Sequence, residues 1–154
     1  MDNNFQRIGA ISNAHAGREF EEAAHLYFKE TGVHLQRDFD VPVGFRTKKL
    51  KRFDLGSESP PIIVECKSFT WTETGKSPSA KMYALNEVML VFSAAPPHYR
   101  RILFVLKHMK NGISLASHYV SRFGHLIGSN VEIWEFDLTT KRASCVHENN
   151  SGTI

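Results

Sequence analysis

The sequence predicts an α/β protein, and three observations indicate this class. Apolar residues recur at helical spacing over residues 17–32 and again over residues 78–95. Between these segments, β-prone residues first alternate with polar ones and then run continuously up to residue 67. A second continuous apolar run, at residues 102–106, is typical of a central strand covered on both faces. Helices that alternate with such strands are expected to pack on the faces of one sheet.

The first helix is expected within residues 17–32, where one face is apolar. The apolar stripe consists of Phe20, Ala23, Ala24, Tyr27 and Phe28. Gly32 is a suitable C-terminal stop, because glycine readily adopts the left-handed conformation found there. Three acids, Glu19, Glu21 and Glu22, lie in the first half of the segment. One interpretation is that they favour the positive end of the helix dipole.

Three strands are expected after this helix. Residues 33–45 alternate apolar and polar side chains, as a half-buried strand does. The next two strands form a β-hairpin, with a turn at residues 58–61 and a short, strongly β-prone second strand at residues 62–66.

The register of this hairpin brings two acids together. Leu55 is expected to pair with Val64, so that Asp54 faces Glu65. Opposed side chains have Cβ atoms about 4.5–5.5 Å apart, and like charges at that distance repel. A cation is therefore expected between them, and Mg²⁺ suits carboxylate ligands. Lys67 shares the strand face with Glu65, where it could hold a metal-activated water or stabilise charge on a phosphate.

The remaining pattern predicts two further helices and two strands. Pro78 opens a helix that closes before Pro96. The apolar run at residues 102–106 is the central strand, a third helix covers residues 114–126, and a last strand covers residues 131–136.

Composition indicates one ordinary globular domain. The chain has 154 residues, of which 42% are hydrophobic and 23% charged, enough for a sizeable core but not for a second domain. We expect a single domain over residues 1–147 and a flexible tail over residues 148–154. The N-terminus has no basic and apolar signal segment and no stretch is long enough to span a membrane, so a cytoplasmic protein without a membrane partner is expected.

The hairpin residues resemble the PD-(D/E)XK nuclease superfamily. Asp54 corresponds to the first acid of that motif, Glu65 to the second and Lys67 to the lysine, while Phe53 stands where the family has proline. The segment from Gly17 to Gly32 is similar to the first helix of the same superfamily. There the helix acid maps to Glu21, with Glu22 as the alternative.

The resemblance spans roughly residues 16–107 and implies a fold and an activity. The implied fold is a three-layer α/β/α, restriction-endonuclease-like one with a central mixed β-sheet and the core order αβββαβ. The implied activity is Mg²⁺-dependent endonuclease, with DNA as the expected substrate and Mn²⁺ as an expected substitute for Mg²⁺. Asp54, Glu65 and the backbone carbonyl of Cys66 would bind the metal, Glu21 would complete the acidic cluster, and Lys67 would position the nucleophile. A homodimer is plausible by analogy.

A run of basic residues lies directly before Asp54. It consists of Arg46, Lys48, Lys49, Lys51 and Arg52. Such a run would neutralise phosphates and attract a polyanion by counterion release, and the hairpin register places Arg52 opposite Lys67. The alternative is a solvated loop. Lys81, near the start of the second helix, is a further candidate for nucleic-acid binding, although an exposed helix lysine is the simpler interpretation.

Two alternatives to an enzyme stay open. The first is a catalytically silent nucleic-acid-binding or assembly module that has kept the fold. The second is a structural ion pair in which Lys67 neutralises Asp54 or Glu65 without any chemistry. Trp71, just past the motif strand, could touch a nucleotide, but a buried edge aromatic is the simpler interpretation.

Overall fold

The computed structural model describes residues 4–149, and the side chains of residues 14–149. The expected tail therefore lies, from residue 150 on, outside the described residues. The helices are α1 (Asn4–Glu30), α2 (Ser79–Ala94), α3 (Leu115–Phe123) and the short 3₁₀ helix η1 (Gly124–Leu126). The strands are β1 (Gln36–Val43), β2 (Lys49–Glu58), β3 (Pro61–Lys67), β4 (Arg100–Leu106), β5 (Met109–Lys110), β6 (Ile113–Ser114), β7 (Val131–Asp137) and β8 (Arg142–His147). Among the described helices, none is long and apolar enough to span a membrane.

Six strands form one mixed central sheet in the order β1-β2-β3-β4-β7-β8. Its centre is parallel, because β3 pairs with β4 and β4 with β7 in the same direction. The outer pairs β1–β2, β2–β3 and β7–β8 are antiparallel. The predicted α/β class is thus confirmed, and the helix, three strands, helix and strand appear in the predicted order.

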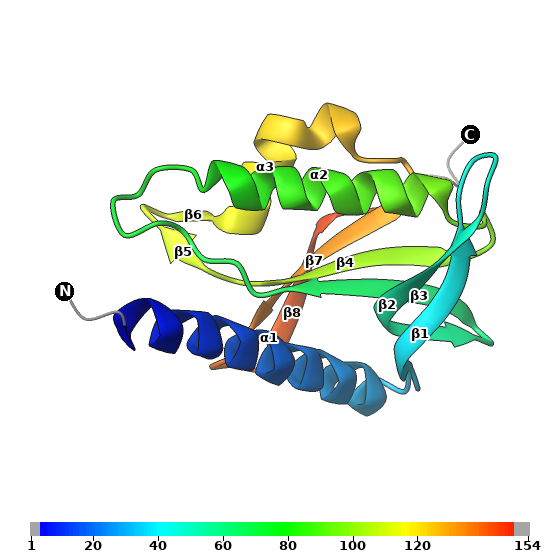
Figure 1. The fold of residues 1–154 in the computed structure, drawn as a ribbon, viewed down its shortest axis with the longest axis horizontal. Helices are drawn as coiled ribbons and strands as arrows, with labels where there is room; N and C mark the ends of the chain where they lie inside the picture. Colours follow the sequence, from blue (N-terminus) through cyan, green and yellow to red (C-terminus); the bar gives the residue numbers. More distant parts are fainter. Residues whose placement is uncertain (1–3, 150–154) are drawn as a thin grey trace.

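Helices cover both faces of this sheet (Figure 1). On one face α1 packs its apolar stripe on β3, and this cluster includes Phe20, Ala24, Phe28, Ile62, Val64 and Cys66. On the other face α2 and α3 pack on the sheet, and that cluster includes Ile63, Met82, Leu85, Phe92, Leu103 and Tyr119. Successive residues of β3 therefore point into different cores, so both faces of the motif strand are covered.

Helix α1 ends as predicted but begins much earlier than the residues that predicted it. At its C-terminus the Val33 N–H donates to the Phe28 carbonyl and the Gly32 N–H to the Lys29 carbonyl, with Gly32 at a φ of +88°. These are the two bonds of a Schellman cap. Because the helix begins at Asn4, the acids at positions 19, 21 and 22 lie in its interior. The interpretation that they complement the N-terminal dipole is therefore wrong.

The motif hairpin has the predicted register over part of its length. Leu55 pairs with Val64 as expected, but Glu58 already pairs with Pro61, so the turn is shorter than predicted. The β2–β3 ladder runs from there only to the pair Leu55–Val64. Asp54 is therefore not paired with Glu65 across the ladder, and the expected opposition of Arg52 and Lys67 is likewise not formed.

The regular alternation of side chains along β2 is interrupted at Asp54, next to the point where the β2–β3 ladder ends. Phe53 and Leu55 are two residues apart, yet Phe53 belongs to the α2 core and Leu55 to the α1 core. On the neighbouring strand β1, Asp38 has a φ of +55°, a left-handed conformation that aspartate tolerates better than most residues. At this interruption the Asp54 side chain lies against the backbone of β3, where it accepts the Cys66 N–H.

Later elements also follow the predictions, with additions. Helix α2 begins after Pro78, and the helix expected at 114–126 appears as α3 followed by η1. Ser114 caps α3, since its Oγ accepts the Ser117 N–H at 3.0 Å. The edge strand β8 and the small β5–β6 ribbon were not predicted.

Candidate active site

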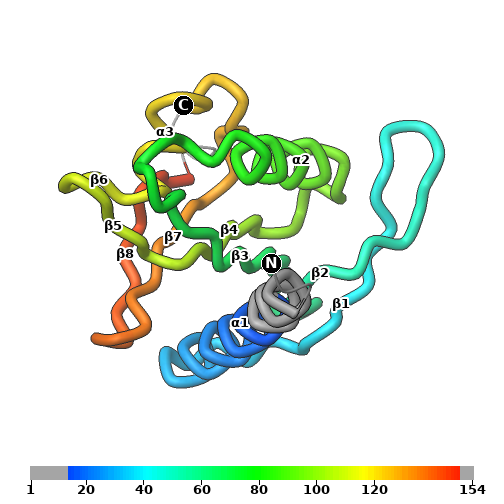
Figure 2. The backbone as a smooth tube through the Cα atoms, turned by 60° about the vertical axis from the view of Figure 1, so that its left-hand side comes forward, coloured from blue at the N-terminus to red at the C-terminus, as the bar shows by residue number. Residues whose placement is uncertain are grey.

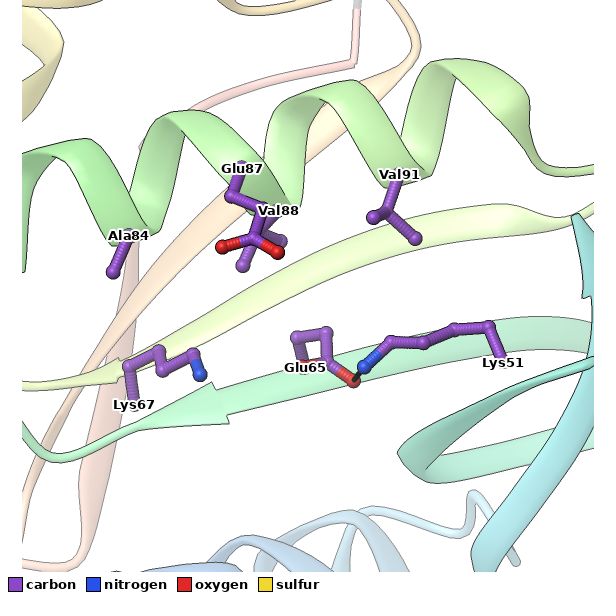
Figure 3. A pocket seen from close by; sticks show the side chains of 7 residues that line it. All are labelled: Lys51, Glu65, Lys67, Ala84, Glu87, Val88 and Val91. Carbon is purple, nitrogen blue, oxygen red and sulfur yellow. Dashed lines mark ion pairs between the residues drawn. The ribbon is translucent and has the colours of Figure 1, made fainter. Parts of the chain in front are cut away.

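Glu65 is the centre of the candidate site. It lies on β3, which is hydrogen-bonded to β4 on one side, and its side chain is only 6% exposed. It faces a small open cleft of about 110 Å³ between the sheet and α2 (Figure 3). The cleft is lined by Lys51, Glu65, Lys67, Ala84, Glu87, Val88 and Val91. Its Oε1 atom is buried and accepts no hydrogen bond from the described residues.

The surroundings of Glu65 oppose its ionisation. Burial, and next the negative charge of Asp54, raise the pKa of Glu65 to about 7 from an ordinary value of 4.5. The positive charges of Lys51 and Lys67 act in the opposite direction. A carboxyl group in a cleft whose pKa lies near neutral pH is a functional-site candidate, although structural ion pairs also shift pKa values.

Asp54 is tied to the strand that carries Glu65. Its Oδ2 accepts the Cys66 N–H at 2.8 Å, which takes the place of the backbone bond that the ladder does not provide there. Only Oδ2 takes part in that bond, so Oδ1 is available to another donor or to a cation. The charge of Asp54 raises the pKa of Glu65 and also that of Glu21. Asp54 therefore interacts electrostatically with both acids.

Helix α1 contributes Glu21 rather than Glu22. The pKa of Glu21 is raised by partial burial and then by Asp54, while Arg37 acts to lower it. Arg37 lies 3.5 Å from Glu21 Oε2 and 3.6 Å from Glu22 Oε1. The side chain of Glu22 is 73% exposed. Of the two alternatives, Glu21 is therefore the acid next to Asp54.

Lys51, not Lys67, is the ion-pair partner of Glu65. The Lys51 Nζ lies 3.6 Å from Glu65 Oε1 (Figure 3). Lys67 lines the same cleft but forms no ion pair with either acid in the described part of the chain, and its Nζ lies 5.8 Å from the centre of the Phe69 ring. The alternative in which Lys67 serves as a structural counter-ion of Asp54 or Glu65 is therefore wrong.

The basic run divides into three parts. Lys51 turns into the cleft. Arg52 forms two hydrogen bonds with Asp40, at 2.9 and 3.1 Å, and so is largely neutralised. The other three basic residues, Arg46, Lys48 and Lys49, are exposed on the hairpin that joins β1 and β2.

Two weaker candidates lie outside the cleft. The Lys81 Nζ lies 5.9 Å from the centre of the Phe69 ring and donates to the Thr70 carbonyl at 3.4 Å. Trp71 is held by two hydrogen bonds to His108, one from its backbone N–H and one from its indole N–H. This supports the interpretation of Trp71 as an edge aromatic.

Sequence reasoning missed the helix side of the cleft. Ala84, Glu87, Val88 and Val91 extend from α2 toward Glu65 (Figure 3). Their i, i+3, i+4, i+7 spacing was the available signal, because residues so spaced share one helix face. Glu87 adds a further carboxylate at the exposed rim.

The donor set fits a hard divalent cation in part. Asp54 Oδ1 and Glu65 Oε1 are carboxylate oxygens of the kind a Mg²⁺ ion prefers, and neither accepts a hydrogen bond from the described residues, although Lys51 lies 3.6 Å from Glu65 Oε1. Mg²⁺ is commonly bound through one or two carboxylates while it keeps several waters. However, the described residues contain no group of three or more histidine, cysteine, aspartate or glutamate side chains placed to hold a metal ion. Burial raises the pKa of the Cys66 thiol well above its usual value, so its sulfur is no ready ligand.

Comparisons of the chain with protein-family models, with curated proteins and with solved structures find no match. The class that the fold and the cleft define is an α/β protein with a buried carboxylate between two lysines. Any narrower assignment depends on the chemistry of the cleft itself.

Proposed function

We propose that the protein is a Mg²⁺-dependent endonuclease of the restriction-endonuclease-like fold, which hydrolyses phosphodiester bonds in DNA. The observation that carries the proposal is the Glu65 carboxylate, which is buried on β3 and opens onto a cleft between Lys51 and Lys67. Its Oε1 accepts no hydrogen bond from the described residues. Lys51 offsets only part of the cost of burying this acid, because the pKa of Glu65 stays raised. A site that binds a cation and a phosphate would explain why the protein keeps a carboxylate in this buried position.

Glu65 and Lys67 of the cleft, together with residues of the neighbouring strands and of α1, have roles in this proposal. Asp54 and Glu65, with the backbone carbonyl of Cys66, would hold the metal, and Glu21 would support the cluster through Asp54. Bound Mg²⁺, or Mn²⁺ in its place, would supply Lewis-acid stabilisation of the phosphate and an activated water. Lys67, which forms no ion pair with a carboxylate of the described residues, would stabilise negative charge on the phosphate or orient the attacking water.

The arrangement of elements supports the narrower fold. Helix α1, strands β1 to β3, helix α2 and strand β4 follow in the order that the resemblance implies, and the hairpin that carries both acids lies beside the parallel centre of the sheet.

Plasmid nicking by Glu65→Gln protein in Mg²⁺ tests the proposal. The amide keeps the size of the side chain but removes its charge, so nicking should be lost while the fold remains. Glu135→Gln is a matched control, since Glu135 is also buried and has an unpartnered Oε2, but it lies on β7 outside the cleft. Nicking by Glu65→Gln at the wild-type rate would contradict the assignment.

A second candidate is the catalytically silent nucleic-acid-binding or assembly module. The Lys51–Glu65 ion pair favours it, because the buried acid then has a protein counter-ion and needs no metal. A wild-type protein that binds DNA but shows no cleavage with Mg²⁺ or Mn²⁺ would support this candidate instead.

A further inference from the structure

The hairpin between β1 and β2 projects beyond the rest of the molecule (Figure 2). We define the arm as residues 42–50, which run Pro-Val-Gly-Phe-Arg-Thr-Lys-Lys-Leu. Its base is paired, with Pro42 opposite Leu50 and Val43 opposite Lys49. The arm carries three positive charges and no acid.

Two large apolar side chains are exposed on this arm. Phe45 is 71% exposed and Leu50 is 65% exposed, more than any other large hydrophobic residue among those described. Single exposed apolar residues are common. Here, however, both lie on one short projecting ribbon among three cations, where no core and no neighbouring element covers them.

The shape of the arm is fixed at its base. The Gly44 N–H donates to the Ala94 carbonyl at the end of α2, at 3.0 Å, and Val43 packs against the α2 core. Gly44 has a φ of +148°, and a Cβ there would lie 1.8 Å from the Thr47 carbonyl oxygen. The Lys48 ammonium donates to the Gly44 carbonyl at 2.7 Å, which closes the turn. The arm is therefore a paired two-stranded base that carries a turn of residues 44–48, and the turn is held by these hydrogen bonds.

We propose that this arm enters a groove of the DNA duplex beside the cleavage site. The cations would contact phosphates on the rims, while Phe45 and Leu50 would contact bases and sugars inside the groove. The inference rests on the proposed function, which identifies the polyanion as DNA. The new element is that the DNA is double-stranded where the arm binds it.

Shape and charge both favour a duplex. A two-stranded β-ribbon has the dimensions of the major groove, whereas single strands are usually bound in concave, positively charged grooves. The arm is convex. An apolar side chain that reaches the major groove, as Phe45 would, can contact the thymine methyl group directly.

The arm is also continuous with the cleft. Lys49 precedes Lys51 by two residues on β2, or roughly 7 Å along the strand, and Lys51 reaches Glu65. A backbone held by the arm would thus pass close to the buried acid.

The test compares two arm variants in equilibrium binding to a labelled DNA duplex, without Mg²⁺ and at several salt concentrations. Phe45→Ala/Leu50→Ala should bind about tenfold more weakly or worse at every salt concentration, with an unchanged salt slope. Arg46→Ala/Lys49→Ala, which keeps the Lys48 bond that closes the turn, should instead reduce the slope of log affinity against log salt by about 1.8, because each phosphate contact contributes about 0.9. Tyr83→Ala/Leu90→Ala is the matched control, since both side chains are exposed on α2, and it should bind as wild type does.

The outcomes separate the arm from the enzyme. Wild-type affinity in Phe45→Ala/Leu50→Ala would overturn the inference, even if the wild type cleaves DNA. Equal losses for duplex and single strand would overturn the groove geometry. Binding to anionic vesicles in place of DNA, or loss of self-association with unchanged DNA affinity, would also overturn it. Duplex binding that depends on the arm, without any cleavage, would support the inference and contradict only the nuclease.

Discussion

Lys51 reaches from strand β2 to within 3.6 Å of the Glu65 carboxylate on strand β3. Since the β2–β3 ladder ends before either residue, this ion pair is a side-chain link between two strands that have begun to separate. It is also the contact that a metal ion bound to Glu65 would have to share or displace.

The first prediction concerns Lys51→Met. Lys51 lowers the pKa of Glu65, so its removal should raise that pKa further and leave an ionised Glu65 without its partner. The variant should lose stability at pH 8, where Glu65 is ionised, and little at pH 5, where it is protonated. Urea unfolding at both pH values measures this. Lys49→Met, an exposed position on the same strand, is the control; an equal loss at both pH values would contradict the prediction.

The second prediction concerns the pH dependence of wild-type stability. The pKa of Glu65 is about 7 in the folded state and near 4.5 when unfolded, so the folded state binds more protons between these values. Glu65 should therefore reduce the free energy of unfolding as pH rises from 4.5 to 7, by up to about 3 kcal/mol at 1.36 kcal/mol per unit. Glu65→Gln should remove most of this decline.

The control for that measurement is Glu22→Gln, whose side chain is mostly exposed and hydrated in both states. It should retain the decline seen in the wild type. A Glu65→Gln protein whose stability falls as steeply as that of the wild type would show that other groups cause the dependence.

The third prediction concerns Mg²⁺ itself. An ion that binds only the folded state must raise the melting temperature, in proportion to the logarithm of its concentration once the site is saturated. Asp54→Asn should abolish this rise yet remain folded, because the asparagine oxygen can still accept the Cys66 N–H. Differential scanning fluorimetry of both proteins, with and without Mg²⁺, measures this rise in melting temperature. An undiminished rise in Asp54→Asn would place the ion elsewhere.

The fourth prediction separates Lys67 from Lys51. Lys67→Ala should keep its melting temperature, since no ion pair of Lys67 with Asp54 or Glu65 is lost, and it should still bind Mg²⁺ and DNA. Its cleavage rate should fall by roughly a hundredfold or more, as when one group that stabilises transition-state charge is removed. Normal cleavage by this variant would remove Lys67 from the mechanism.

Much of the fold could be predicted because its signals are local. The spacing of Phe20, Ala24 and Phe28 specifies the buried face of α1, and Pro78 specifies where α2 starts. The run at residues 102–106 reads as a covered strand because β4 is paired on both sides and packed on both faces. Strand β8 escaped prediction because it is an edge strand without regular alternation of buried and exposed residues.

The candidate site could be predicted only in part, because it depends on a departure from regular geometry. Strict alternation along β2 cannot place both Phe53 and Leu55 correctly, since these two residues, one position either side of Asp54, belong to opposite cores. Lys51 consequently reads as one more surface cation in the sequence, whereas it lies beside Glu65. Glu87 escaped notice because its helix face becomes significant only once α2 is known to lie over β3.

The hydrogen bond from the Cys66 N–H to Asp54 makes one backbone amide a reporter of the whole site. A cation that draws on the Asp54 carboxyl group would weaken or reorient this bond, and the amide proton should respond in its NMR chemical shift and exchange rate. Occupancy could then be followed at a single resonance on a buried strand, with no substrate present and no turnover required.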